Sequence, residues 1–311
     1  MEKEILFTDE VHRSLLSANV VSAWDARLDA WQWFQEKQTG YELPWKKLRN
    51  SFLIAKGEMT IISGYTGHGK SEFVNHIALH CVKQGARAFI ASLELSTGNL
   101  WGRLYRQATG VIDPTFEYLT KCYNFYDKKI FTYDLLGHAD IDCLIESARI
   151  ACEYAGCDLF VFDNLMMLNS LVDDFKKQHE ITQKLLQFSK ERNVCVILVA
   201  HSKKPAVNRD LPCPGMYDVS GSSNIVNMVD NHISVTINNT KIRANAKLKE
   251  NCELTDAEEK SLAFGDSIIM RDKKREIGEL FRASLYYDKR FTVLKEYETE
   301  RPFNYMEGRN E

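Results

Sequence analysis

A glycine-rich segment constrains the fold of this chain more than any other feature. Residues 64–71 read GYTGHGKS and fit the pattern GxxxxGK[ST]. Glycines let the backbone turn tightly enough for its N–H groups to face a phosphate, and the N-terminus of a following helix adds partial positive charge. A β-branched run at 59–63 precedes the segment, and a helical pattern at 72–83 follows it. This order of strand, loop and helix predicts a phosphate-binding loop on an α/β domain.

The same loop predicts where a nucleoside triphosphate and its metal ion bind. Lys70 is expected to reach the β- and γ-phosphates, and the Ser71 hydroxyl is expected to bind Mg²⁺. His68 stands at a variable position of the pattern, so it is included without a separate role. The expected substrate is ATP or dTTP, with Mg²⁺ as cofactor. The residues expected to contact it are Gly64, Thr66, Gly67, His68, Gly69, Lys70 and Ser71.

Apolar strands alternate with helical segments through the middle of the chain. This alternation indicates an α/β fold whose central sheet is mostly parallel and flanked by helices on both faces. The last third instead predicts strands with few helices between them, and a polar stretch at 238–266 is expected to be an exposed excursion. The expected strands are 59–63, 88–92, 159–162, 194–200, 233–237, 267–271, 282–287 and 291–295, and the expected helices are 72–83, 97–109, 140–154 and 178–192.

The two ends of the chain differ from this core. An apolar stripe at three- and four-residue spacing predicts a mostly helical N-terminal segment, through Val20, Val21, Trp24, Leu28, Trp31 and Phe34. This helix either caps the domain's own core or docks on a neighbouring subunit. The expected division is a helical linker at 1–50, an ATPase domain at 51–300 and a mobile tail at 301–311.

Composition excludes several classes of protein. The formal net charge is −3, so a polyanion would need a local basic surface. The eight cysteines include no CxxC pair, which argues against a zinc ribbon and suits reduced thiols in the cytosol. The N-terminus lacks the pattern of a signal peptide, and the apolar runs are too short to span a bilayer. We expect no membrane partner and a cytoplasmic location, which would be the host cytoplasm for a viral protein.

Polar residues end three of the expected strands, at the sheet edge where ligands bind in open α/β folds. Asp163 is expected to hold Mg²⁺, directly or through water, although it could instead cap a helix. Asn164 either positions a ligand or caps the next helix. Glu94 could orient or deprotonate the attacking water, or could be a surface charge. His201 could hydrogen-bond the γ-phosphate and sense its loss, and His232 is expected to be a structural or surface residue.

Two basic clusters follow strands of the same region. The first is Lys203, Lys204 and Arg209, and the second is Arg271, Lys273, Lys274 and Arg275. Each cluster is either a solvated face, a set of contacts to a nucleic-acid backbone, or a source of cations for a neighbour's nucleotide site. Composition alone favours the solvated face.

The order and spacing of these motifs resemble the ring-forming replicative DNA helicases of the RecA-like group, such as bacterial DnaB, the phage primase-helicases and mitochondrial Twinkle. The resemblance covers roughly 57–295. Residues 92–96, SLELS, are similar to the segment that carries the catalytic base. The other similar segments are 57–64 with the phosphate loop, 162–165 with Walker B, 199–204 with the sensor strand, 218–224 with the DNA-binding motif and 273–278 with the KNRxxG element.

The resemblance implies a RecA-like hexameric ring with ATP between subunits, which moves 5′ to 3′ on single-stranded DNA. It makes Glu94 the catalytic base and His201 the phosphate sensor, and it implies that Lys273 and Arg275 reach the next subunit's ATP. Channel loops would lie at about 169–177 and 203–218. The residues expected to contact DNA phosphates are Lys203, Lys204 and Arg209.

Departures from the family pattern shape the remaining expectations. The N-terminal stretch is too short for a primase, so a separate primase, a polymerase and a helicase loader are the expected partners besides DNA. The stretch would then be the linker that swaps onto a neighbour. The alternative function is a RecA- or KaiC-like DNA-stimulated ATPase that binds DNA or a partner without unwinding. A small-molecule kinase would need an arginine-bearing lid and an acceptor pocket, which the sequence does not show.

Overall fold

The computed structural model describes residues 8–35, 39–49, 52–167, 175–203, 213–220, 223–274, 281–301 and 304–306. The chain divides into two compact units, Met1–Thr39 and Gly40–Glu311. Residues 40–49 therefore belong with the larger unit, and the division lies at residue 39 instead of residue 50. No helix among the described residues is both long and apolar enough to cross a membrane.

The smaller unit contains two short helices, α1 (Asp9–Ser17) and α2 (Arg27–Gln35). The prediction of one apolar stripe along a single helix was wrong, because the residues between α1 and α2 are not helical. Asn19, at a φ of 59°, adopts the left-handed conformation just after α1 and ends it. Trp24 is 72% exposed and Trp31 is 63% exposed. These two tryptophan side chains therefore lie largely in solvent.

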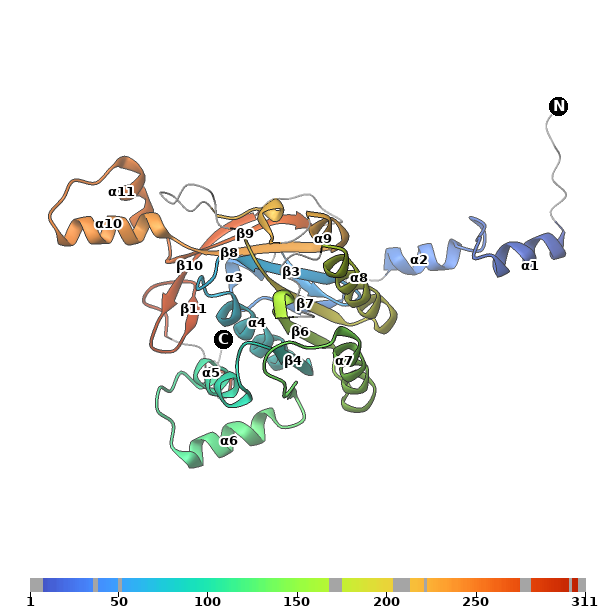
Figure 1. Cartoon of the computed structure of the whole chain (residues 1–311), viewed down its shortest axis with the longest axis horizontal. Coiled ribbons are helices and arrows are strands. Elements are labelled where there is room, and N and C mark those ends of the chain that lie inside the picture. The colour runs from blue at the N-terminus through green and yellow to red at the C-terminus, as the bar shows by residue number, and fades with distance from the viewer. Residues whose placement is uncertain are drawn as a thin grey trace. The chain divides into compact units, whose positions relative to one another are not determined.

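A nine-stranded sheet forms the centre of the larger unit, in the order β11-β10-β9-β8-β3-β7-β6-β4-β5 (Figure 1). The six neighbours from β8 to β5 are parallel, and the last three strands along the chain add antiparallel pairs. A separate hairpin pairs β1 (Gly40–Glu42) with β2 (Leu53–Ala55). The strands are β3 (Met59–Gly64), β4 (Ala88–Ser92), β5 (Ile130–Thr132), β6 (Leu159–Asp163), β7 (Cys195–His201), β8 (Asn231–Ile237), β9 (Ser267–Lys274), β10 (Phe281–Asp288) and β11 (Val293–Lys295).

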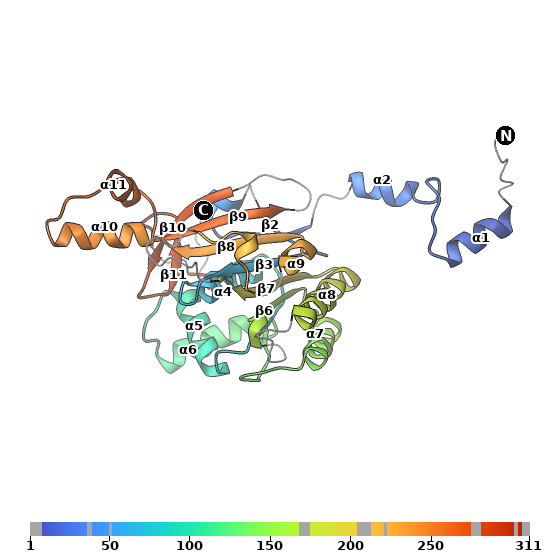
Figure 2. The ribbon, with the colours of Figure 1, turned by 45° about the horizontal axis from the view of Figure 1, so that its top comes forward.

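Helices cover both faces of the sheet. Alternate strand residues point to opposite faces, so Ile62 and Val161 join one core cluster while Ile61 and Phe160 join the other. The first cluster lies beneath α3 (Lys46–Arg49), α4 (Lys70–Lys83) and α5 (Thr97–Thr109). The second lies beneath α7 (Ile141–Ala155), α8 (Phe175–Arg192) and α9 (Ser223–Met228), and α7 and α8 run side by side (Figure 2). The predicted α/β fold is confirmed.

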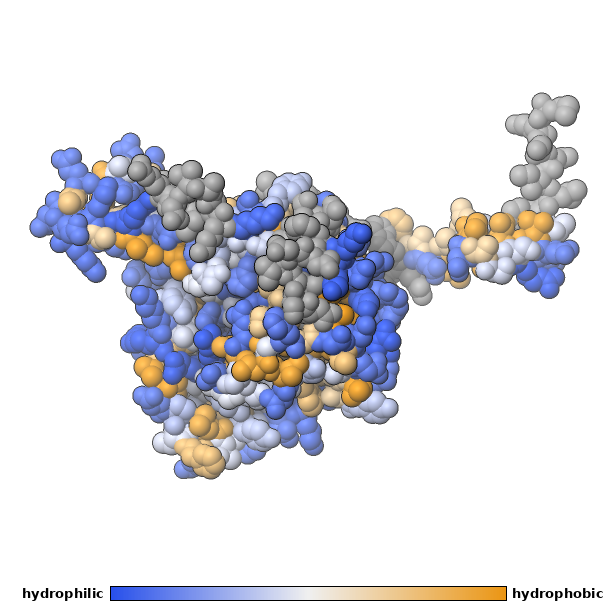
Figure 3. All heavy atoms as spheres, in the orientation of Figure 1, coloured by the Kyte–Doolittle hydropathy of each residue, from blue (hydrophilic) through white to orange (hydrophobic). Residues whose placement is uncertain are grey.

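The polar stretch at 238–266, predicted to be an exposed excursion, is helical. It forms a helical hairpin of α10 (Asn239–Lys249) and α11 (Asp256–Leu262), with Asn238 capping α10 and a capping box of Thr255 and Glu258 starting α11. The hairpin projects from the sheet beyond β8 and β9, and its visible surface is mostly hydrophilic (Figures 1 and 3). The expected excursion is therefore a capped helical insertion, and the sequence analysis did not predict its two helices.

Part of the C-terminal segment is packed against the domain, contrary to the predicted mobile tail. Tyr305 is 2% exposed, and its ring contacts His76 and His80 on α4. Its backbone N–H donates to the carbonyl of Ala108 at 2.8 Å. Burial lowers the pKa of His76 to about 3 and that of His80 to about 4, so both rings are neutral where the tail docks.

Candidate nucleotide-binding site

A cavity of about 300 Å³ opens at the carboxyl ends of β3, β4, β6 and β7. Strand order explains its place, because parallel strands end at one edge of the sheet and present their last residues there. Most of the residues predicted for the site are brought together. The lining residues are Thr66, Gly67, His68, Gly69, Lys70, Ser71, Glu72, Glu94, Arg103, Asp163, Asn164, His201, Ile237, Ser267, Tyr287 and Leu294.

The phosphate loop has the backbone that its glycines predicted. Gly67 and Gly69 adopt φ values of 78° and 83°, which side-chain-bearing residues rarely reach, and α4 begins directly after Gly69. Gly64 lies against β8, because a Cβ built there would be 2.2 Å from the carbonyl oxygen of Val235. The loop is therefore fixed between strand β8 and the N-terminus of α4.

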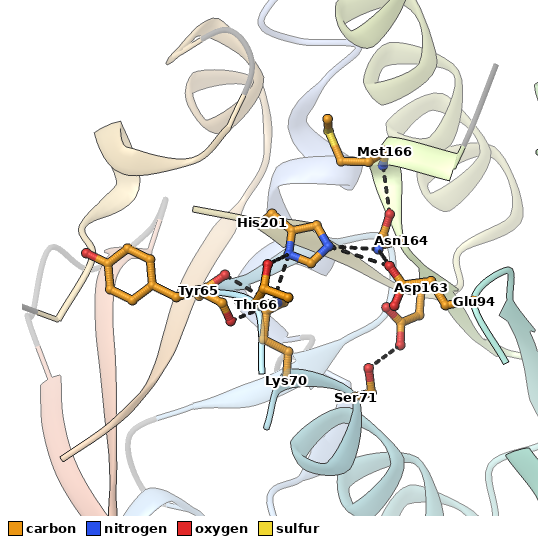
Figure 4. Close-up of polar contacts among 10 residues, drawn as sticks. Tyr65, Thr66, Lys70, Ser71, Glu94, Asp163, Asn164, Met166 and His201 are labelled. Carbon is orange, nitrogen blue, oxygen red and sulfur yellow. Dashed lines mark hydrogen bonds and ion pairs between the residues drawn. The ribbon is translucent and has the colours of Figure 1, made fainter. Parts of the chain in front are cut away.

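Lys70 is buried at 6% exposure and points back into its own loop (Figure 4). Its ammonium donates to the carbonyls of Gly64, at 3.1 Å, and Tyr65, at 3.0 Å, and lies 3.2 Å from Nδ1 of His201. Burial lowers its pKa, while the carboxylates of Asp163 and Glu94 oppose that shift. A triphosphate would replace these carbonyls with a stronger anionic acceptor.

Ser71 and Asp163 meet where the magnesium ion was predicted. The Ser71 hydroxyl donates to Oδ2 of Asp163 at 2.6 Å. Burial raises the pKa of Asp163 to about 6, and nearby Glu94 adds to the rise although Ser71 opposes it. Hydroxyl and carboxylate oxygens are the ligands that Mg²⁺ prefers beside phosphates and water, so the pair fits the ion. Among the described residues no group of three or more acidic, histidine or cysteine side chains could hold a metal alone.

Asn164 contacts both Glu94 and His201. Its side-chain nitrogen donates to Oε1 of Glu94 and lies 3.0 Å from Nε2 of His201, while its oxygen accepts from the N–H of Met166 at 2.9 Å (Figure 4). The amide oxygen thereby caps the short helix η1 (Leu165–Met167), and the positioning role of Asn164 stays a prediction. It holds Glu94 beside His201, with Oε1 3.6 Å from Nε2.

His201 connects the cavity to the loop that follows β7. An ammonium can only donate, so Nδ1 of His201 accepts from Lys70. Burial lowers the pKa of His201, and Lys70 lowers it further against the pull of Glu94. The His201 carbonyl accepts from the N–H of Ser220 at 2.7 Å, and the N–H of Lys203 donates to the carbonyl of Asp218 at 2.7 Å. These bonds close the base of the loop 203–218.

Several predicted residues lie outside this cavity. Lys273 does not line it, and its ammonium donates to the carbonyls of Val226, at 2.5 Å, and Asn227, at 2.9 Å, on α9. Lys203 is exposed at the start of its loop. Lys204, Arg209 and Arg275 lie outside the described residues, as does most of the first predicted channel loop.

Other residues at the site were missed from the sequence. Arg103 on α5 forms an ion pair with Glu72 at 3.0 Å, and Tyr287 and Leu294 reach the cavity from β10 and β11. Burial raises the pKa of Tyr287, so its hydroxyl keeps its proton. No sequence pattern marks these residues, because only the antiparallel edge of the sheet brings the C-terminal strands beside α4 and α5.

Comparison with known proteins decides the family. A model of the DnaB-like helicase C-terminal domain matches residues 52–296 of the chain. The chain belongs to this family. The match covers all the cavity-lining residues and ends just after β11, so the suspected resemblance to RecA-like replicative helicases is confirmed.

Individual relatives are distant and longer. The Twinkle homolog protein, chloroplastic/mitochondrial, of Arabidopsis thaliana is 25% identical over 221 residues, which cover 63% of this chain and 30% of that protein. The DNA helicase/primase of Enterobacteria phage T3 is 26% identical over 170 residues, which cover 48% and 29%. The chain thus spans less than a third of either relative. A solved structure of a DnaB-like replicative helicase, described with its interactions with primase, matches this chain with a TM-score of 0.70 at 14% identity. The match covers 93% of this chain and 72% of that chain, and it shows the RecA-like fold.

Proposed function

We propose that this DnaB-like domain is the motor of a ring-shaped DNA helicase, which moves 5′ to 3′ along single-stranded DNA and separates strands. It would hydrolyse ATP or dTTP at the interfaces between subunits. The observation that carries the proposal is that Lys70, Asp163, Glu94 and His201 line one cavity beside the phosphate loop.

Each of these cavity residues would have a separate role in hydrolysis. Lys70 would exchange its loop carbonyls for the β- and γ-phosphates, because a phosphate oxygen carries more negative charge than a carbonyl. Ser71 and Asp163 would hold Mg²⁺, which neutralises charge on the triphosphate when bound. Glu94, oriented by Asn164, would accept the proton of the attacking water.

His201 would couple the chemistry to DNA. Its ring faces the cavity, and its backbone is bonded to the base of the loop 203–218. Departure of the γ-phosphate would change the partners of the ring, and the shift would pass directly into that loop. Lys203, with Lys204 and Arg209 farther along, would contact the DNA phosphates there.

The ring supplies what one subunit lacks. Lys273 lies outside the cavity of its own chain, and the proposal assigns it with Arg275 to the nucleotide of the next subunit. The exposed aromatic side chains of α2, such as Trp31, would bury themselves on a neighbour as the linker. A separate primase, polymerase and loader would complete the replication machinery.

A strand-separation assay tests the proposal. The purified full chain is mixed with a forked DNA duplex, Mg²⁺ and ATP or dTTP, and release of the labelled strand is followed over time. The control is Glu94→Gln, which should bind nucleotide but hydrolyse it at least a hundredfold more slowly. Mass photometry with a non-hydrolysable analogue and single-stranded DNA should show assemblies of six subunits.

The outcomes separate the alternatives. Unwinding of forks with a free 5′ tail, but not of forks with only a free 3′ tail, supports the proposed polarity. DNA-stimulated hydrolysis without any strand release would instead support a RecA- or KaiC-like ATPase. No binding of Mg²⁺–nucleotide in calorimetry would contradict both.

A further inference from the structure

A second histidine, apart from the nucleotide cavity, joins four segments through a chain of hydrogen bonds. Nε2 of His232, on β8, lies 2.8 Å from the Ser63 hydroxyl, at the end of β3. Its Nδ1 hydrogen-bonds Oδ1 of Asp272 on β9, and Oδ2 of Asp272 accepts from the N–H of Met216. Met216 begins the short helix η2 (Met216–Asp218). We call Ser63, His232 and Asp272 the β8–β9 relay.

A β-bulge places the carboxylate of this relay. His232 pairs with Lys273 and Ile233 pairs with Arg271, so Asp272 is an extra residue with no partner of its own on β8. Such a bulge redirects a side chain that the regular pleat would aim elsewhere, and it increases the local twist. The bulge therefore turns Asp272 toward His232 and toward the loop, immediately before Lys273.

The relay is not a hydrolytic triad, although its side chains are of the types that form one. Ser63 and His232 are both 0% exposed, so no substrate can reach the serine hydroxyl. A carboxylate can only accept, so Nδ1 carries a proton, and in a neutral ring the Ser63 hydroxyl donates to Nε2. The hydrogen bonds then run from Ser63 through His232 to Asp272, and this arrangement fits residues that hold one another in position.

The relay connects the phosphate loop with the candidate DNA loop, whose states must be coupled in a DNA-driven motor. Ser63 immediately precedes Gly64, the first residue of the phosphate loop. Met216 lies at the far end of the loop 203–218, and a Cβ built on the neighbouring Gly215 would be in van der Waals contact with Oδ2 of Asp272, at 3.4 Å. The relay thus joins the phosphate loop to the end of the candidate DNA loop opposite His201.

We propose that the β8–β9 relay transmits DNA contact at the loop 203–218 to the phosphate loop, with His232 and Asp272 as positioning residues for DNA-stimulated hydrolysis. This inference rests on the proposed function, because it assigns a role in the response to DNA. The Ser63–His232 bond is buried and the two bonds to Asp272 are partly buried. Losing one bond to the charged Asp272 can shift an equilibrium about tenfold.

Steady-state hydrolysis with and without an oligothymidylate strand tests the relay. Ser63→Ala and Asp272→Asn should each reduce the stimulation by DNA about tenfold, while basal kcat and the KM for nucleotide change less than about twofold. The double variant should lose no more than the stronger single variant, because both act through His232. Ser189→Ala is the matched control, since it removes an equally buried hydroxyl that only bonds within α8.

Each other outcome overturns a defined part of the inference. Basal and stimulated rates that fall together, losses that add in the double variant, or failure of both single variants to fold would show a merely structural cluster. Full stimulation in both variants would also refute the relay. If the unaltered protein binds DNA and nucleotide but shows no stimulation, the proposed function fails before the relay is reached.

Discussion

The raised pKa of Asp163 predicts that the metal site destabilises the protein when it holds no metal. The carboxyl has a pKa of about 6 when folded, because it is buried, and 3.8 as its ordinary value in the unfolded chain. Between about pH 4 and pH 6 the folded protein therefore binds a proton that the unfolded chain has lost, and stability falls as the pH rises through this window. Two pKa units correspond to about 3 kcal/mol at pH 7.5.

Asp163→Asn should remove this loss while keeping the shape of the side chain. Its amide oxygen can still accept from Ser71, and the variant carries no charge to bury. Without Mg²⁺ and nucleotide, its melting temperature should match that of the unaltered protein near pH 4 and exceed it by about 6 °C at pH 7.5, at roughly 2 °C per kcal/mol for a domain of this size. Magnesium-dependent hydrolysis should be lost in the same variant.

Scanning calorimetry across about pH 4 to pH 8 measures the effect. Asp142→Asn is the control, because it makes the same substitution at a side chain that is 71% exposed and paired with Lys184 on the surface. A difference in melting temperature that stays constant with pH, or an Asp163→Asn variant that is less stable at pH 7.5, would refute the explanation by burial.

Two further predictions concern the subunit interface and the tail. Lys273→Ala and Glu94→Gln subunits should each be inactive alone but regain DNA-stimulated hydrolysis when mixed in equal amounts. The reason is that about one interface in four would combine an intact Glu94 with an intact Lys273. Mixtures as inactive as the single variants would place Lys273 in its own subunit's site. Tyr305→Ala should destabilise the domain by about 3 kcal/mol in denaturant titrations. Tyr123→Ala, at a tyrosine that is 58% exposed, should change stability far less, and equal effects would contradict the role of the docked tail.

The core of the fold was predictable because its signals are local. Strand β4 and helix α5 were predicted to the residue, since an apolar run and a serine cap mark their ends. The phosphate loop, Asp163, Glu94 and His201 were predictable because strand ends of a parallel sheet share one edge. Helix α6 (Phe116–Tyr126) was missed, although Thr115 caps it.

Features that depend on distant pairing could not be predicted. The relay needs the bulge between β8 and β9, and no periodicity shows which residue of Asp272 and Lys273 is the extra one. Tyr305 is buried against His76 and His80 of α4 and bonds Ala108 of α5, and the sequence near Tyr305 gives no sign of this. Tyr287 and Leu294 enter the cavity for the same kind of reason, through the order of strands.

The helical insertion starts and ends at a single point of the sheet, and this makes it a convenient place to modify the protein. The N–H of Asn238 donates to the carbonyl of Asp266 at 2.8 Å, and its side chain donates to the carbonyl of Gly265 at 3.1 Å. A short glycine-rich turn could therefore replace α10 and α11 without separating β8 from β9. The same position offers a graft point for a fluorescent or affinity tag that leaves both chain ends unaltered.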